Sequence, residues 1–100
     1  MLPLVIVDLD GTMIGKSGQV LPCVWQGVDR LLEAGVKLAV CTGRPGMGVA
    51  LRVAERIGPR NPHIFNNGAL VTYVDGDTQH AAALKESDVL DLISHARRLG

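Results

Sequence analysis

The sequence has few aromatic residues, few cysteines and no excess of charge of either sign. Its 100 residues include one Trp, one Tyr and one Phe, and its ten basic residues balance its ten acidic residues. Without a basic stripe, and with so few aromatic side chains for base stacking, nucleic acid is not expected as a main partner. The two cysteines, Cys23 and Cys41, do not indicate a disulfide framework.

Long apolar stretches are also missing. No run approaches the ~20 residues that a membrane-spanning helix requires. The apolar run near the N-terminus follows no basic segment and is interrupted early by Asp8, which does not fit a signal peptide. We therefore expect a cytoplasmic protein without a membrane partner. Its apolar content of 47% supports one small domain, or part of a larger one.

A pair of carboxylates follows a buried strand near the N-terminus. Residues 4–7 are all aliphatic, and Asp8-Leu9-Asp10-Gly11-Thr12 comes directly after them. Charge at the end of a core strand is costly unless a partner compensates it, and a bound cation is the simplest partner. Magnesium fits best, because it prefers hard oxygen ligands and keeps several waters.

The order of the predicted elements indicates an α/β fold. The pattern predicts strands over 2–9, 36–41 and 63–65, a polar glycine-bearing loop over 11–18, helices over 21–35 and 48–57, a hairpin from 69–74 and 78–84, and a final helix capped by Ser87. Alternating strands and helices favour a Rossmann-like parallel sheet with helices on both faces, to which the hairpin is added.

Polar residues gather at the carboxyl ends of the predicted strands, where ligands of such sheets bind. These ends are residues 8–12, 42–44 and 66–68. Asp8 and Asp10 are two residues apart, so they point the same way and can divide the roles of nucleophile and general acid/base. Thr42, Gly43 and Arg44 lie before a helix and can provide a hydroxyl, close backbone approach and a positive charge for a phosphate.

Together, these motifs resemble the haloacid dehalogenase-like (HAD) superfamily of phosphohydrolases, and most closely its Cof-type sugar-phosphatase branch. Asp8-Leu9-Asp10-Gly11-Thr12 matches the first motif of the family, and Thr42-Gly43-Arg44-Pro45 matches the second as that branch writes it. Asn67-Gly68-Ala69 matches a third signature of the branch. The order and spacing agree over essentially the whole chain.

The resemblance implies a magnesium-dependent phosphatase acting on a small phosphorylated metabolite, a sugar phosphate in this branch. Asp8 would attack phosphorus and bind Mg²⁺, while Asp10 would serve as acid and base and ligate the metal through its backbone carbonyl. The phosphoryl group would be held by Thr42, by the N–H of Gly43 and by the backbone near Leu9. On the substrate side, the resemblance places Arg44 and Asn67.

The chain departs from the family pattern in what it does not contain. The family also uses a lysine and a later acidic pair, which normally follow a large α/β cap inserted after the second motif. This sequence contains neither a lysine in that context nor the acidic pair. Residues 1–83 are therefore expected to be the N-terminal part of the core and residues 84–100 the start of the cap. The remainder of core and cap is absent, and we expect little or no turnover from these residues in isolation.

The same motifs also occur in other kinds of site. An EF-hand loop needs a glutamate where Gln19 stands, and a P-loop needs a glycine where Asp10 stands, so neither fits. Taken alone, residues 42–44 could cap a helix and residues 66–68 could form a turn. Two other functions stay open, a phosphate-accepting signalling domain of the receiver type and a non-catalytic fragment, although receivers carry their acceptor on the third strand.

Overall fold

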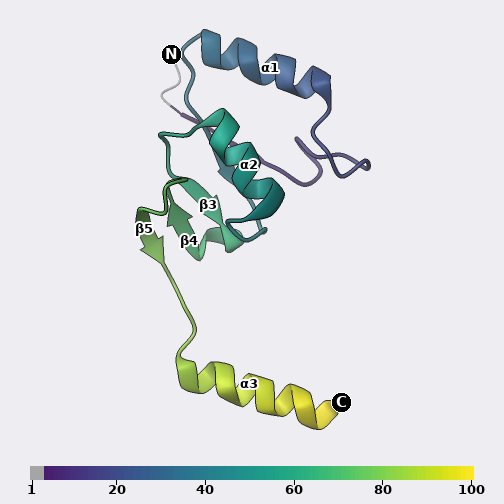
Figure 1. Cartoon of the computed structure of the whole chain (residues 1–100), viewed down its shortest axis with the longest axis vertical. Helices are drawn as coiled ribbons and strands as arrows, with labels where there is room; N and C mark the ends of the chain where they lie inside the picture. Colours follow the sequence, from purple (N-terminus) through teal and green to yellow (C-terminus); the bar gives the residue numbers. More distant parts are fainter. Residues whose placement is uncertain (1–3) are drawn as a thin grey trace.

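The structure is a computed structural model that describes residues 4–100, and its described part contains a five-stranded sheet and three α-helices (Figure 1). In chain order the elements are β1 (Val5–Asp8), α1 (Pro22–Glu33), β2 (Leu38–Cys41), α2 (Gly48–Ile57), β3 (His63–Phe65), a 3₁₀ turn (Asn66–Gly68), β4 (Leu70–Thr72), β5 (Thr78–Ala81) and α3 (Glu86–Leu99). The first strand is predicted from residue 2, but residues 2 and 3 lie outside the described range.

The sheet has the order β1-β2-β3-β4-β5. The first three strands are parallel, and the hairpin of β4 and β5 extends the sheet in antiparallel fashion. The predicted α/β class, with its parallel sheet and added hairpin, is confirmed. Within the described residues β1 pairs with β2 alone and forms one edge of the sheet.

The two crossover helices lie on the same face of the sheet, which differs from the predicted arrangement on both faces. Crossovers between parallel strands are right-handed, so two that advance in one direction across the sheet place both helices on one side. Val28 of α1 and Val53 of α2 accordingly join one core cluster with Val40 of β2. On the opposite face Ile6 is 52% exposed, because neither α1 nor α2 reaches it.

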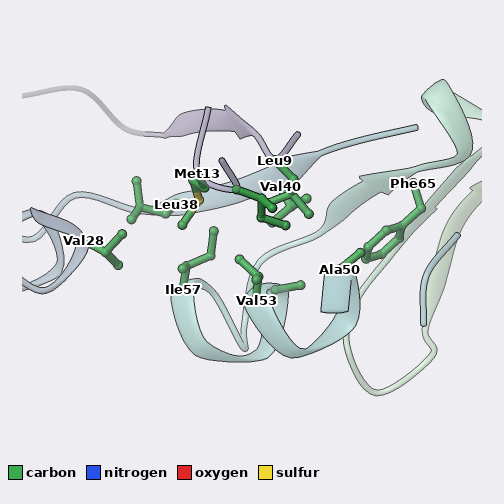
Figure 2. Close-up of a cluster of buried hydrophobic side chains, with 11 residues drawn as sticks. Leu9, Met13, Val28, Leu38, Val40, Ala50, Val53, Ile57 and Phe65 are labelled. Atoms are coloured by element: carbon green, nitrogen blue, oxygen red, sulfur yellow. The ribbon is translucent and has the colours of Figure 1, made fainter. Parts of the chain in front are cut away.

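The core lies between this face of the sheet and α2 (Figure 2). Ile57 and Val53 point from α2 toward Leu38 and Val40 of β2, and Ala50 lies beside Phe65 of β3. The full cluster also takes in residues from the loop after β1, from α1, from β3 and from the rest of α2: Leu9, Met13, Ile14, Val28, Phe65 and Ala54.

The loop that follows β1 is more buried than its composition predicts. Met13 is 5% exposed and Ile14 is 2% exposed, although both come from the stretch predicted as a polar loop. Ile14 donates its N–H to Leu9 O at 2.8 Å and bridges to Val20, so the segment folds back on itself. Two apolar anchors therefore fix this loop to the core directly after the carboxylates.

A buried histidine connects β2, β3 and the end of α2. His63 is 0% exposed, its Nδ1 accepts the Val40 N–H at 3.0 Å, and its Nε2 lies 2.7 Å from Gly58 O. Because Nδ1 accepts a hydrogen bond, the ring is neutral and carries its hydrogen on Nε2. Burial lowers the pKa of His63 from 6.5, an effect that the Gly58 carbonyl partly opposes. The neutral His63 side chain thus takes the place of backbone–backbone hydrogen bonds between the short strands β2 and β3.

The final helix stands apart from the sheet. Residues 82–85 lead away from β5 to α3 (Figure 1). Every residue of α3 is exposed. Ser87 was predicted as its N-cap, which is wrong, because the helix begins at Glu86 and Lys85 occupies the cap without a side-chain bond. Glu86 and Asp88 in the first turn complement the helix dipole and favour this earlier start. None of the helices in residues 4–100 has the length and apolar character needed to cross a bilayer.

Candidate functional site

Backbone hydrogen bonds bring the three polar strand ends together at one edge of the sheet. Asp8 is in register with Cys41, the residue before Thr42. Thr42 donates its N–H to Ile64 O at 2.9 Å and accepts the Asn67 N–H at its carbonyl, at 3.1 Å. Asn66 donates its N–H to Arg44 O at 3.0 Å. The loops after β1, β2 and β3 therefore form one continuous surface.

Asp8, the candidate nucleophile, is the last residue of β1 and has an exposed side chain. Its Oδ1 accepts the N–H of Leu9 at 2.9 Å, which fixes the orientation of the carboxylate and leaves Oδ2 without a protein donor among the described residues. Leu9 is 0% exposed, and its carbonyl accepts the N–H groups of Thr12 and Ile14. The backbone of Leu9 therefore shapes the turn that presents Asp8.

Asp10 forms a bidentate ion pair with Arg44. Arg44 donates from Nε to Oδ2 at 2.8 Å and from Nη2 to Oδ1 at 2.7 Å. The side-chain hydrogen bonds from Arg44, aided by its charge, hold the pKa of Asp10 below its usual range. Asp10 is consequently ionised at neutral pH, the form that accepts a proton. To donate a proton to a leaving group, the carboxyl would first have to be protonated, which the Arg44 contact opposes.

Thr42 and Gly43 lie close to Asn67. Thr42 is 3% exposed, and its Oγ1 accepts the Arg44 N–H at 3.1 Å, so the hydroxyl hydrogen is left to donate. A Cβ built on Gly43 would lie 2.9 Å from Asn67 Oδ1, which shows how closely the amide approaches this backbone. Gly43 is not in the first turn of α2, because that helix begins at Gly48.

The turn after β3 has an unusual backbone. Asn66 and Asn67 have φ values of 52° and 54°, and Gly68 follows at 98°. Left-handed conformations are uncommon for residues other than glycine, and two in succession persist only where the surroundings hold them. The bonds to Thr42 and Arg44 supply that support here. Backbone strain of this kind is common at functional sites. Here the strained turn places the Asn67 side chain beside Gly43.

The oxygen donors at this edge fit magnesium in kind. Mg²⁺ binds through one or two carboxylates and keeps several waters, and Asp8 offers an exposed carboxylate. The carboxylate oxygens of Asp10 are engaged by Arg44, but its backbone carbonyl accepts none of the backbone bonds found in residues 4–100. No cluster of three or more His, Cys, Asp or Glu side chains able to hold a metal occurs in that range. Further oxygen ligands would have to come from water or from residues outside it.

The comparison with known protein families identifies the family of this chain. The family model of haloacid dehalogenase-like hydrolases matches residues 5–100. The chain belongs to this family. It is 28% identical to a Streptococcus pyogenes serotype M6 protein named "Putative phosphatase", over 99% of this chain and 38% of that protein.

Solved structures of HAD-like proteins share the fold. A haloacid dehalogenase-like hydrolase from Bacteroides thetaiotaomicron has a TM-score of 0.84 at 24% identity, over 98% of this chain and 38% of its own. A sugar phosphatase of HAD subclass IIB has a TM-score of 0.76 at 18% identity, over 99% of this chain and 38% of its own. The chain therefore spans less than two-fifths of the length of these relatives.

One feature of the site could not be found in the sequence motifs. Arg44 was expected on the substrate side, and the structure places its guanidinium on Asp10. The two residues are 34 positions apart, so no local spacing indicates the pair. The left-handed turn did leave a signal, because Asn-Asn-Gly contains the residues that adopt positive φ most readily.

Proposed function

We propose that this chain provides the nucleophile and phosphate-binding half of a magnesium-dependent phosphatase. The observation that carries the proposal is the exposed, oriented carboxylate of Asp8 at the end of β1, beside the loop of Thr42 and Gly43. Membership of the HAD-like hydrolase family supports the reaction class. The substrate is a small phosphorylated metabolite, and the structural likeness to a sugar phosphatase favours a sugar phosphate.

The proposed reaction has two displacements at phosphorus. Asp10 enters the first displacement protonated, which requires that Arg44 leave its carboxylate for the substrate. An oxygen of Asp8 then forms a bond to phosphorus while the bond to the ester oxygen breaks, and the leaving alcohol takes the proton from Asp10. In the second, Asp10 removes a proton from water, the water oxygen attacks phosphorus, and the bond to Asp8 breaks. The products are the alcohol and inorganic phosphate, and both aspartates return to their starting state.

The surrounding residues stabilise the phosphoryl group in this proposal. The Thr42 hydroxyl and the Gly43 N–H donate to its oxygens, and the Leu9 N–H exchanges its bond to Asp8 for the phosphate when substrate is present. Arg44 and Asn67 face the remainder of the substrate. Bound magnesium, held by Asp8 and the Asp10 carbonyl, would neutralise the charge that otherwise repels an anionic substrate.

The proposal also divides the chain. Residues 1–83 are proposed as the N-terminal part of the catalytic core and residues 84–100 as the start of a cap domain. The chain corresponds to 38% of the length of two relatives, which supports the proposal that it is part of a longer polypeptide. The missing positive charge and acidic ligands would then come from residues that this sequence does not contain.

The test compares the isolated chain with the natural polypeptide that carries its sequence. Hydrolysis of p-nitrophenyl phosphate is measured with and without Mg²⁺. We expect Mg²⁺-dependent turnover from the natural polypeptide, loss to background in Asp8→Asn, and a fall of about 10²- to 10⁴-fold in Asp10→Asn, the range for a general acid/base. Residues 1–100 alone should show little or none.

A matched control is available in the hairpin turn. Asp75 is an exposed aspartate whose Oδ1 accepts the Asp77 N–H, and Asp75→Asn should leave turnover unchanged. If Asp8→Asn retained the activity of Asp75→Asn, the proposed nucleophile would be wrong. A long-lived phosphorylated Asp8 without turnover would instead identify a receiver-type switch, and no labelling at all would leave a non-catalytic role.

A further inference from the structure

A cavity that shares no residue with the strand-end site lies between α1, α2 and the loop before α1. Its volume is about 300 Å³, and it is lined by Gly18, Gln19, Val20, Trp25, Val49, Arg52, Val53 and Arg56. None of these residues is among those that form the candidate phosphatase site. Their apolar members supply most of the wall, so the interior favours a hydrocarbon or aromatic body.

Positive charge borders the cavity. Arg52 and Arg56 are one helical turn apart on α2, and both side chains are exposed. Arg56 reaches Asp29 at 3.8 Å, whereas Arg52 forms no ion pair among the described residues. The residues that line the cavity include two guanidinium groups and no carboxylate, and Asp29 reaches Arg56 from outside the lining. The excess favours an anion at the mouth of the cavity.

The cavity also offers a surface for a flat ring. The guanidinium of Arg56 lies 3.8 Å from the centroid of the Trp25 ring and stacks on it, which holds the indole in place. Aromatic rings pack favourably against indole and against branched aliphatic side chains. A cavity of this volume is at the lower end of the range for ligand pockets, which limits the ligand to one or two rings.

We propose that this cavity binds a small aromatic carboxylate, with its ring against Trp25 and Val53 and its carboxylate on Arg52 and Arg56. A guanidinium matches a carboxylate with two parallel N–H···O bonds, so the geometry of the ligand class fits the rim. The ring fills the apolar interior. This site is independent of the phosphatase proposal and can be tested on the chain itself.

The wall of the cavity adjoins segments that also hold the strand-end site. Val20 bridges to Ile14 and so closes the loop that begins after Asp10. Val49 lies in the first turn of α2, which follows the loop of Thr42. A bound ligand would therefore contact both the loop after β1 and the helix after β2.

Trp25 is the only tryptophan of the chain, so its fluorescence reports on the cavity directly. The experiment titrates the chain with 3-phenylpropionate and, in parallel, with the neutral 3-phenylpropionamide. We expect a saturable change in Trp25 emission with a dissociation constant of about 1 mM or tighter for the acid. The amide should bind roughly tenfold or more weakly, because it lacks the charge-assisted bonds.

Variants separate the cavity from non-specific quenching. Arg52→Gln should weaken acid binding by roughly tenfold, the effect of one lost charged hydrogen bond. Arg97→Gln, on the exposed face of α3, is the matched control and should bind as the wild type does. Val49→Phe should abolish binding by filling the space, and circular dichroism verifies that each variant is folded. Equal affinity for acid and amide, a linear response, or unchanged binding in Arg52→Gln would overturn the proposal.

Discussion

The molecule has two regions that contrast in how their apolar side chains are used. The first, residues 4–81, which we call the body, contains the sheet, α1 and α2 and buries the whole core cluster. The second, residues 84–100, which we call the arm, carries α3 and has no buried residue. The radius of gyration is 16.4 Å, against about 13 Å for a compact 100-residue chain, because the arm extends from the body.

The difference shows what a helical pattern establishes by itself. Both α2 and α3 have apolar residues at helical spacing, and both are helices. In α2 that stripe meets β2, and Ile57 is 1% exposed; in α3 the equivalent Ile93 is 43% exposed. Periodicity therefore predicts which face of a helix is apolar, while the surface that covers this face depends on the rest of the fold.

The largest expected effect sharpens this contrast with one substitution in each helix. Ile57→Ala removes packing from the core and should lower the free energy of unfolding by about 2–5 kcal/mol. Ile93→Ala in the arm should change it by about 0.5 kcal/mol or less, the range for surface substitutions. Urea denaturation of both variants measures the two values. Equal losses would show that the arm packs on the body in solution.

A second prediction concerns the tightness of the body. A Cβ on Gly58 would clash with the backbone oxygen of Leu38 and lie 3.2 Å from His63 Cε1, so Gly58→Ala should cost about 1–3 kcal/mol. Gly27, inside α1, has nothing within 4 Å of a Cβ. Gly27→Ala is the matched control, and it should stabilise the chain by up to about 1 kcal/mol. Thermal unfolding of both variants should give shifts of opposite sign.

The smallest expected effect is a pH dependence of stability that arises in the body and not in the arm. Because burial lowers the pKa of His63 below 6.5 in the folded chain, the unfolded chain binds more protons as the pH falls. The contribution of His63 to the free energy of unfolding is therefore fully present above about pH 6.5. Below that pH it decreases, by at most about 1.4 kcal/mol per pH unit for one proton.

Variants of two histidines test this dependence. His63→Gln should lower stability at every pH and remove the decrease below pH 6.5. His95→Gln in the exposed arm should leave the pH profile as it is. Denaturation curves at several pH values measure both. A profile for His63→Gln that kept the slope of the unaltered chain would assign the pH dependence to another group.

Much of the fold was predictable where local signals are strong. Pro22 starts α1, Gly35 follows it with a φ of 83°, and α2 covers the predicted residues 48–57. The three polar strand ends do meet, because parallel strands bring their carboxyl ends to one edge. The roles assigned to the site residues stay predictions, although their placement is consistent with a shared site.

Long-range contacts were not predictable from the same sequence. The bonds from His63 to Val40 and Gly58, and from Arg44 to Asp10, join residues whose partners are set only by the sheet order. The uncovered face around Ile6 also depends on that order, since both crossovers advance in one direction. A helix pattern gives no information about which side of the sheet it will occupy.

The position of β1 at the edge of the described sheet has a consequence for self-association. An edge strand presents a row of unpaired N–H and C=O groups, and such a row is a template for another strand. Beside this row, Ile6 is 52% exposed and Leu4 is 39% exposed, with only four residues in the strand. The strand that carries Asp8 is thus held from one side alone, and in the described residues it is one of the two edges at which another strand could pair.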